Sequence, residues 1–142
     1  MSRLTEQLNL KDVNRVVQCF YDKARNDADI GHYFSTIEDF SEHEQRISCF
    51  WWLALGGKTD ELEKPAPNFD MIYKHIALGI TATDLSIWLK LFKRTLHEEL
   101  EPKIAESWWN KAEEIARHLK ALAIDRKPTG LQITEPGSEN ET

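Results

Sequence analysis

The feature that most constrains the fold is a helical spacing of apolar residues that recurs along most of the chain. Between residues 10 and 26 the apolar side chains fall three and four positions apart, which places them on one face of a helix. That face holds Val13, Val16, Val17, Phe20, Tyr21 and Ala24. No stretch alternates apolar and polar residues for long enough to predict a strand. The sequence therefore predicts an all-α fold.

A second helix is predicted to begin at Ser41. Glu44 follows three residues later, and this pairing is typical of a capping box, in which each side chain accepts a hydrogen bond from the other residue's backbone. Gly56 and Gly57 are predicted to end the helix. Its inward face is expected to hold Ile47, Phe50, Trp51 and Ala54.

Two further long helices are predicted in the second half of the chain. Thr81 and Asp84 form another capping-box pattern, and Pro102 stands where the last helix would begin. The first of these helices is expected to turn Leu85, Trp88, Leu89 and Phe92 inward. The last is expected to run to about Ala123 with Ile104, Trp108, Ile115, Leu119 and Leu122 inward, leaving the neighbouring Trp109 at the surface.

The remaining segments divide the chain into one domain and a tail. Residues 27–40 and 58–68 are rich in turn-forming residues, and 69–77 is a short apolar segment that could form about two helical turns. After Asp125 the composition shifts to Pro, Gly, Ser, Glu and Thr. We expect one helical domain over residues 1–125 and a disordered acidic tail over 126–142.

Composition narrows the class of protein. No apolar run is long enough to span a bilayer, and the first ten residues lack the apolar centre of a signal peptide. Because no export signal is recognised, we predict a cytoplasmic protein in which Cys19 and Cys49 stay reduced. The net charge of −6 argues against a nucleic-acid partner, which requires a basic face. A monomer is the default expectation.

Familiar catalytic motifs do not occur in this sequence. It contains neither of the glycine-rich phosphate loops GxxxxGK[ST] and GxGxxG, and neither HExxH nor GxSxG. The residues that could carry chemistry are instead scattered histidines and aromatic residues.

His75 is a candidate metal ligand because it lies in a short apolar segment between Ile72 and Ile76. A partly buried structural histidine is the alternative, and local sequence alone favours it. Tyr21, His43 and Trp88 also lie toward predicted inward faces, where their polar atoms would need partners. Each has an ordinary alternative, as a core tyrosine, a solvent-facing histidine and a packing tryptophan.

Three stretches together resemble the truncated (two-over-two) haemoglobins, and most closely their third group. They are VVQCFYDKARNDADIGHYF, SEHEQRISCFWWLALGG and IYKHIALGITATDLSIWLKLF, and the resemblance covers roughly residues 10–123. It implies a globin-like two-over-two helical sandwich around one haem b.

The resemblance also implies a role for each matching position. His75 would be the iron ligand, and Tyr21, His43 and Trp88 would line the opposite, distal side and stabilise the bound gas. The remaining haem contacts implied are Phe20, Phe34, Ile47 and Phe50 as pocket walls, Ile72 and Ile80 as proximal supports, and Arg46 and Lys74 as propionate partners. A solvated surface charge is the alternative for Arg46.

The implied function is binding of oxygen, and of nitric oxide, at ferrous iron. Three donors around one ligand favour redox chemistry over transport, such as nitric oxide detoxification or peroxidase-like activity. No flavin or nicotinamide motif is present, so a separate reductase would supply electrons. The alternatives are a non-catalytic oxygen carrier or gas sensor and, in another class, a cofactor-free helical interaction domain.

Overall fold

Four long helices make up the body of the molecule. The structure is a computed structural model, and it describes residues 6–62 and 78–125. The long helices are α1 (Leu10–Arg25), α2 (Phe40–Ala54), α4 (Ala82–Glu99) and α5 (Pro102–Leu119). Three shorter helical segments are η2 (Gly31–Phe34), η3 (Thr59–Glu61) and η4 (Lys120–Asp125). No strand occurs within those described ranges, which confirms the all-α prediction.

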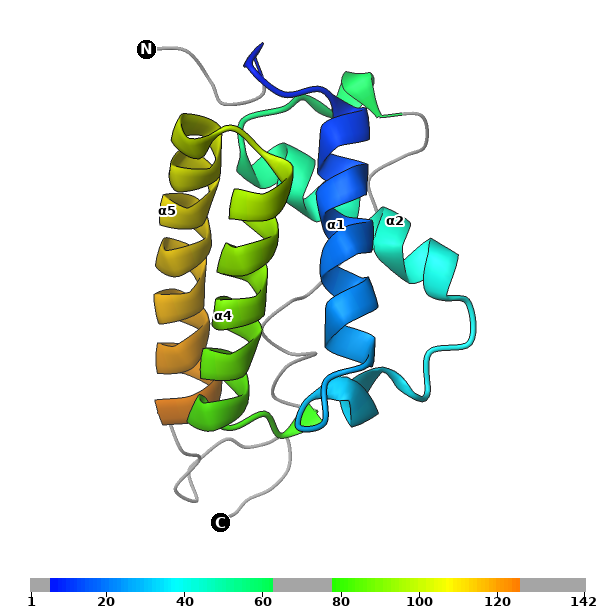
Figure 1. Ribbon diagram of the computed structural model, residues 1–142, viewed down its shortest axis with the longest axis vertical. Helices are drawn as coiled ribbons and strands as arrows, with labels where there is room; N and C mark the ends of the chain where they lie inside the picture. The colour runs from blue at the N-terminus through cyan, green and yellow to red at the C-terminus, as the bar shows by residue number, and fades with distance from the viewer. Residues whose placement is uncertain (1–5, 63–77, 126–142) are drawn as a thin grey trace, which may run out of the picture.

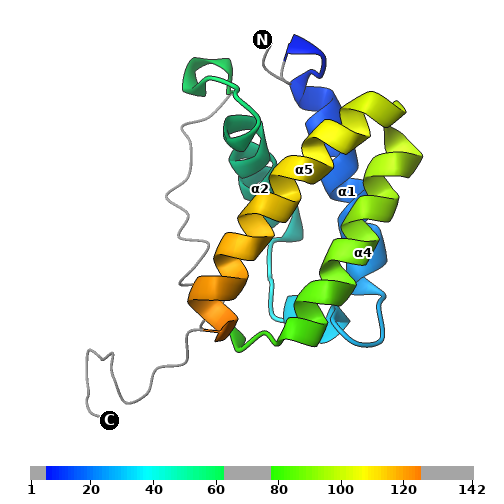
Figure 2. The ribbon, with the colours of Figure 1, turned by 90° about the vertical axis from the view of Figure 1, so that its left-hand side faces the viewer.

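The long helices form two layers of two. α1 packs on α2, α4 packs on α5, and the layers meet mainly where α1 contacts α4 (Figure 1). Seen from the side in Figure 2, α4 and α5 lie in front of α1 and α2. This is the two-over-two arrangement that the resemblance implies, and it makes α1 the helix shared by both layers.

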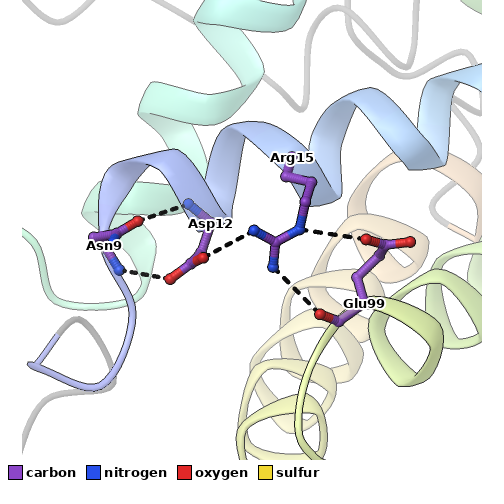
Figure 3. Close-up of polar contacts among 4 residues, drawn as sticks. All are labelled: Asn9, Asp12, Arg15 and Glu99. Atoms are coloured by element: carbon purple, nitrogen blue, oxygen red, sulfur yellow. Dashed lines mark hydrogen bonds and ion pairs between the residues drawn. The ribbon is translucent and has the colours of Figure 1, made fainter.

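α1 buries the face that its sequence predicts, and it begins at a capping box that the sequence analysis does not include. The Oδ1 atom of Asn9 accepts the Asp12 N–H at 2.9 Å, and the Asp12 carboxylate accepts the Asn9 N–H at 3.1 Å (Figure 3). This capping box satisfies two backbone donors that a helix start leaves free. All the apolar residues predicted to face inward on α1 are buried.

Arg15 extends the α1 cap to the end of α4. Its guanidinium donates to Asp12 at 3.0 Å and to the carboxylate and backbone carbonyl of Glu99, both at 3.3 Å (Figure 3). A planar guanidinium with several fixed donors suits such a shared contact. Arg15 therefore joins the two layers by polar contacts at their edge, in addition to the apolar contacts in the core.

The predicted start of α2 is wrong by two residues. Asp39 is the N-cap, and its carboxylate accepts the Glu42 N–H at 3.0 Å, so Ser41 lies inside the helix. The earlier start brings Phe40 into the helix, where its ring packs against Tyr21. Partial burial of this ring favours the longer helix over a start at Ser41.

The inward face of α2 is also rotated from the prediction. Trp51 is buried as expected, but Ser48 and Trp52 are buried too, while Ile47, Phe50 and Ala54 are half-buried. Trp52 lies over Gly57, where an added Cβ would come within 2.3 Å of the indole Nε1. The second glycine of the predicted terminator therefore makes room for a tryptophan.

α4 follows its predicted start, and α5 departs from its predicted end. Thr81 and Asp84 form the expected capping box, and Pro102 is the first residue of α5. The α-helical part of α5 stops at Leu119 and continues as the wider π-helical turn η4. Trp109 is buried rather than at the surface, with the Lys93 ammonium 5.4 Å from its ring centre.

Aromatic rings fill the space between the layers. Phe92 of α4 stacks on Trp51 of α2, with ring centres 5.2 Å apart, and on Trp88 at 5.0 Å. Trp108 of α5 is fully buried against Phe92 and Trp51. Such ring pairs stabilise the fold beyond the area that they bury, by about 0.5–1.5 kcal/mol each.

In the part of the chain that the structure describes, no helix is long and apolar enough to cross a membrane.

Candidate functional site

Tyr21 lies at the centre of the predicted distal residues. Its side chain points from α1 into a ring of aromatic residues and is only 5% exposed. The ring centres of His43 and Phe34 lie 5.3 and 5.4 Å from its own. Burial raises the pKa of the phenol above its ordinary value, with a smaller contribution from the negative charge of Glu44. Tyr21 therefore keeps its proton near neutral pH and can donate a hydrogen bond.

His43 is placed against Tyr21 by the early start of α2. Its backbone N–H donates to the Asp39 carbonyl at 3.1 Å, so it belongs to the regular helix. Its ring packs edge-on to Tyr21 and tilted against Phe40, and its Nε2 atom is buried. A solvent-facing histidine, the ordinary alternative, does not fit this burial.

Trp88 reaches the same group of residues through Phe20. The Trp88 and Phe20 ring centres are 5.0 Å apart, and Phe20 is in turn 5.0 Å from Tyr21. Trp88 is half-buried. The structure thus links the three predicted distal side chains from α1, α2 and α4 through ring contacts: Trp88 packs on Phe20, Phe20 on Tyr21, and Tyr21 on His43.

The other predicted residues divide into three groups. Phe34, Ile47 and Phe50 are half-buried and pack on the same core as Tyr21. Arg46 forms an ion pair with Glu42 at 3.8 Å and is 41% exposed, and Ile80 packs on a separate cluster with Leu85 and Leu119. The expected ligand His75 and its neighbours Ile72 and Lys74 lie outside the described residues.

Phe40 is a site residue that the sequence analysis did not identify. Its ring contacts Tyr21, His43 and Phe34, and the Arg25 guanidinium lies 3.9 Å from its centre. The sequence pattern places residue 40 in a connection, because Ser41 resembles a helix start. The helical spacing of Phe40, His43 and Ile47 is the signal that could have found it.

The described residues fit the polar side of a haem site. The buried Tyr21 side chain and the buried Nε2 atom of His43 lie beside the aromatic rings of Phe34 and Phe40. A diatomic ligand that carries partial negative charge when bound to iron would accept hydrogen bonds from side chains of this kind.

Comparison with protein families decides the identity of the fold. The family model described as bacterial-like globin matches residues 6–122. The chain belongs to the bacterial-like globin family. Membership of this family implies haem-based binding of diatomic gases, and it favours that function over a cofactor-free interaction domain.

Individual globins agree with this assignment. The group 3 truncated hemoglobin ctb of Campylobacter jejuni subsp. jejuni is 28% identical over 123 residues, covering 82% of this chain and 92% of the relative. The crystal structure of a group III truncated hemoglobin from Campylobacter jejuni matches with a TM-score of 0.69 and 26% identity, over 82% of this chain and 91% of that one. These matches confirm the resemblance to the third group of truncated haemoglobins.

More distant globins share the fold. The 2/2 hemoglobin from Synechococcus sp. PCC 7002, solved in the cyanomet state with covalently attached heme, matches with a TM-score of 0.71 at 20% identity, over 86% of this chain and 98% of that one. The group II truncated hemoglobin from Bacillus anthracis matches with a TM-score of 0.67 at 19% identity, over 84% of this chain and 91% of that one. This chain therefore shares the two-over-two helical sandwich with both of these globins.

Proposed function

We propose that this globin binds haem b through His75 and holds oxygen or nitric oxide against Tyr21, His43 and Trp88 for redox chemistry. The observation that supports this most is the buried contact between the Tyr21 and His43 rings, 5.3 Å apart. Haem, when bound, supplies the iron that takes a diatomic ligand and exchanges electrons with it.

The protein's own side chains supply hydrogen-bond donors to the ligand site and exclude water from it. Tyr21 retains its proton and offers it to the ligand, and His43 and Trp88 add ring N–H donors from two other helices. The aromatic side chains of Phe20 and Phe34 exclude water from this face. Hydrogen bonds to a charged acceptor in a dry site are strong, so the bound ligand should leave slowly.

Slow release favours turnover of the ligand over its transport. In nitric oxide dioxygenation, one nitric oxide, one oxygen molecule and one electron give one nitrate ion, which balances atoms and charge. The electron must come from a separate reductase, because the sequence has no flavin or nicotinamide motif. Peroxidase-like turnover would use the same polar face.

We also propose that the protein is a cytoplasmic monomer.

The haem assignment is tested by absorption spectroscopy of the purified chain with added haem. The wild type should show an intense Soret band near 400 nm, and His75→Ala should lose most of it. His118→Ala is the matched control, because His118 is exposed on α5 and should have no effect. A Soret band that is equally intense in all three proteins would show that His75 is not the ligand.

The redox assignment is tested separately. Haem-loaded protein, oxygen and a reductase should consume nitric oxide over many turnovers and release nitrate in equal amount. A single turnover that stops despite the reductase would instead support the alternative of an oxygen carrier or gas sensor.

A further inference from the structure

A polar contact outside the proposed ligand site joins two elements that contribute to it. The hydroxyl of Tyr33, in η2, donates a hydrogen bond to Oδ2 of Asp84, in the first turn of α4, at 2.5 Å. The two residues are 51 positions apart in the sequence. We call this contact the Tyr33–Asp84 bond.

Asp84 is a firm anchor for this bond. The same Oδ2 atom accepts the backbone N–H of Thr81 at 3.0 Å, and Oγ1 of Thr81 accepts the Asp84 N–H at 3.1 Å. The hydrogen bond from Tyr33, followed by that from the Thr81 backbone, lowers the pKa of Asp84. The carboxylate therefore stays ionised, and charge-assisted hydrogen bonds of this kind are the stronger ones.

The two ends of the bond lie next to two of the proposed site residues. Phe34 directly follows Tyr33, and its ring packs on Tyr21 at 5.4 Å. Trp88 is one helical turn after Asp84, on the same side of α4, and its ring packs on Phe20 at 5.0 Å. Since Phe20 and Tyr21 are neighbours on α1, the bond closes a ring of contacts through η2, α1 and α4.

The other end of η2 is fixed by different contacts. The Asp27 carboxylate accepts the N–H groups of Asp29 and Ile30 at 2.8 and 3.0 Å, and Ile30 is buried. Gly31 lies so close to the end of α1 that an added Cβ would come within 2.6 Å of the Arg25 carbonyl oxygen. These contacts hold the start of η2 to α1, whereas Tyr33 holds its end to α4.

We propose that Tyr33 is a positioning residue, which through Asp84 sets the spacing of Phe34 and Trp88 and thereby slows escape of the bound diatomic ligand. This inference rests on the proposed function, since it concerns the same ligand site. Tyr33 acts through its neighbours and is not assigned a contact with the ligand. Without the bond, η2 and the start of α4 can move apart, and the site opens.

The test compares three variants of the haem-loaded full chain. Tyr33→Phe removes only the bond, and Asp84→Ala removes the bond together with half of the α4 cap. Thr81→Ala is the matched control, since it removes the other half of the cap and leaves the Tyr33–Asp84 bond in place. Oxygen dissociation, measured by stopped flow, should become about twofold to tenfold faster in the first two variants and stay unchanged in the control.

A double-mutant cycle tests whether the effect passes through Trp88. If it does, Tyr33→Phe should speed oxygen release much less in a Trp88→Phe background than in the wild type. Hydrogen exchange of the haem-free chain gives a readout independent of ligand binding. Exchange of the backbone amides in residues 31–35 should be faster in Tyr33→Phe than in the wild type or in Thr81→Ala.

The outcomes separate this inference from the function on which it rests. A wild-type chain without a Soret band would overturn both. A normal wild-type spectrum with an unchanged oxygen dissociation rate in Tyr33→Phe would overturn the positioning role alone. Equal acceleration by Tyr33→Phe in the wild-type and Trp88→Phe backgrounds would also overturn it, because the effect would then not pass through Trp88.

Discussion

At the scale of single residues, the chemistry of Tyr21 follows from its surroundings. A tyrosine on an exposed helix face would have an ordinary phenol, whereas this one is covered by Phe34, Phe40 and His43. Burial disfavours the phenolate, which raises the pKa and leaves the hydroxyl as a donor. Near neutral pH the side chain is therefore a hydrogen-bond donor rather than a base.

The role proposed for Tyr21 predicts the effect of Tyr21→Phe. The substitution removes the hydroxyl and keeps the ring, so the packing around it should persist. Oxygen dissociation should accelerate roughly tenfold to a hundredfold, as expected for loss of a hydrogen bond to a charged group. Stopped-flow displacement of oxygen from the haem-loaded protein measures this rate.

Carbon monoxide provides the control for Tyr21→Phe, because it carries little charge when bound. Its dissociation rate should change much less than that of oxygen. If both gases left faster by the same factor, the substitution would have opened the site, and the hydrogen-bond role would be wrong.

At the scale of elements, helix starts and inter-helix ties share the same side chains. Asp12 caps α1 and also receives Arg15, which reaches Glu99 at the end of α4. Asp84 caps α4 and also receives Tyr33 from η2. One carboxylate thereby fixes both where a helix begins and what lies beside it.

This double use of Asp84 predicts a dependence of stability on pH. Because its folded-state pKa is lowered, the ionised carboxylate stabilises the fold at pH values above the ordinary aspartate pKa of about 4. That contribution is lost as the pH falls through the folded-state pKa. The difference in unfolding free energy between the wild type and Asp84→Asn should therefore shrink as the pH drops below about 4.

Urea titrations between neutral and acid pH measure this difference. Tyr33→Phe should lie between the two proteins, since it keeps the carboxylate and loses the largest cause of its lowered pKa. A gap between the wild type and Asp84→Asn that stays constant down to the lowest pH would show that Asp84 does not stabilise the fold through its charge.

At the scale of the whole molecule, α1 carries both the core and the proposed site. It packs on α2 in its own layer and on α4 in the other. Its neighbours Phe20 and Tyr21 point toward Trp88 and His43, which lie on those two helices. The proposed ligand site is therefore built where the two layers meet, and its geometry depends on their packing.

The predicted division of the chain into a domain and a tail is tested by truncation. A chain ending at Asp125 keeps the Lys120–Asp125 ion pair and the partly buried Ile124. Its unfolding free energy should stay within about 0.5 kcal/mol of the full chain, and its haem spectrum should be unchanged. Chemical denaturation followed by circular dichroism measures the first quantity.

A shorter truncation is the matched control. A chain ending at Leu119 lacks η4 and the apolar contacts of Ala123 and Ile124 with the Leu85 cluster. It should be clearly less stable, because those contacts bury apolar surface. Equal destabilisation by both truncations would mean that residues 126–142 contribute to the domain.

The sequence by itself determined the helices, the buried face of α1 and two of the helix starts. These features depend on residues three or four positions apart, such as Thr81 with Asp84 or Val13 with Val17. Such short-range patterns can be read directly from one chain. The same locality explains the error at α2, where Ser41 with Glu44 and Asp39 with Glu42 are both credible starts.

Only the tertiary structure decided which side chains meet. Two contacts join residues from different elements: the Tyr33–Asp84 bond and the packing of Phe40 on Tyr21. The burial of Trp109 likewise depends on how the elements pack. The partner of a residue across such a distance depends on the path of the whole chain, which no local spacing encodes. The distal residues therefore rest on a family resemblance at the level of sequence, and the structure links Tyr21 to His43 directly and to Trp88 through Phe20. His75 stays a prediction.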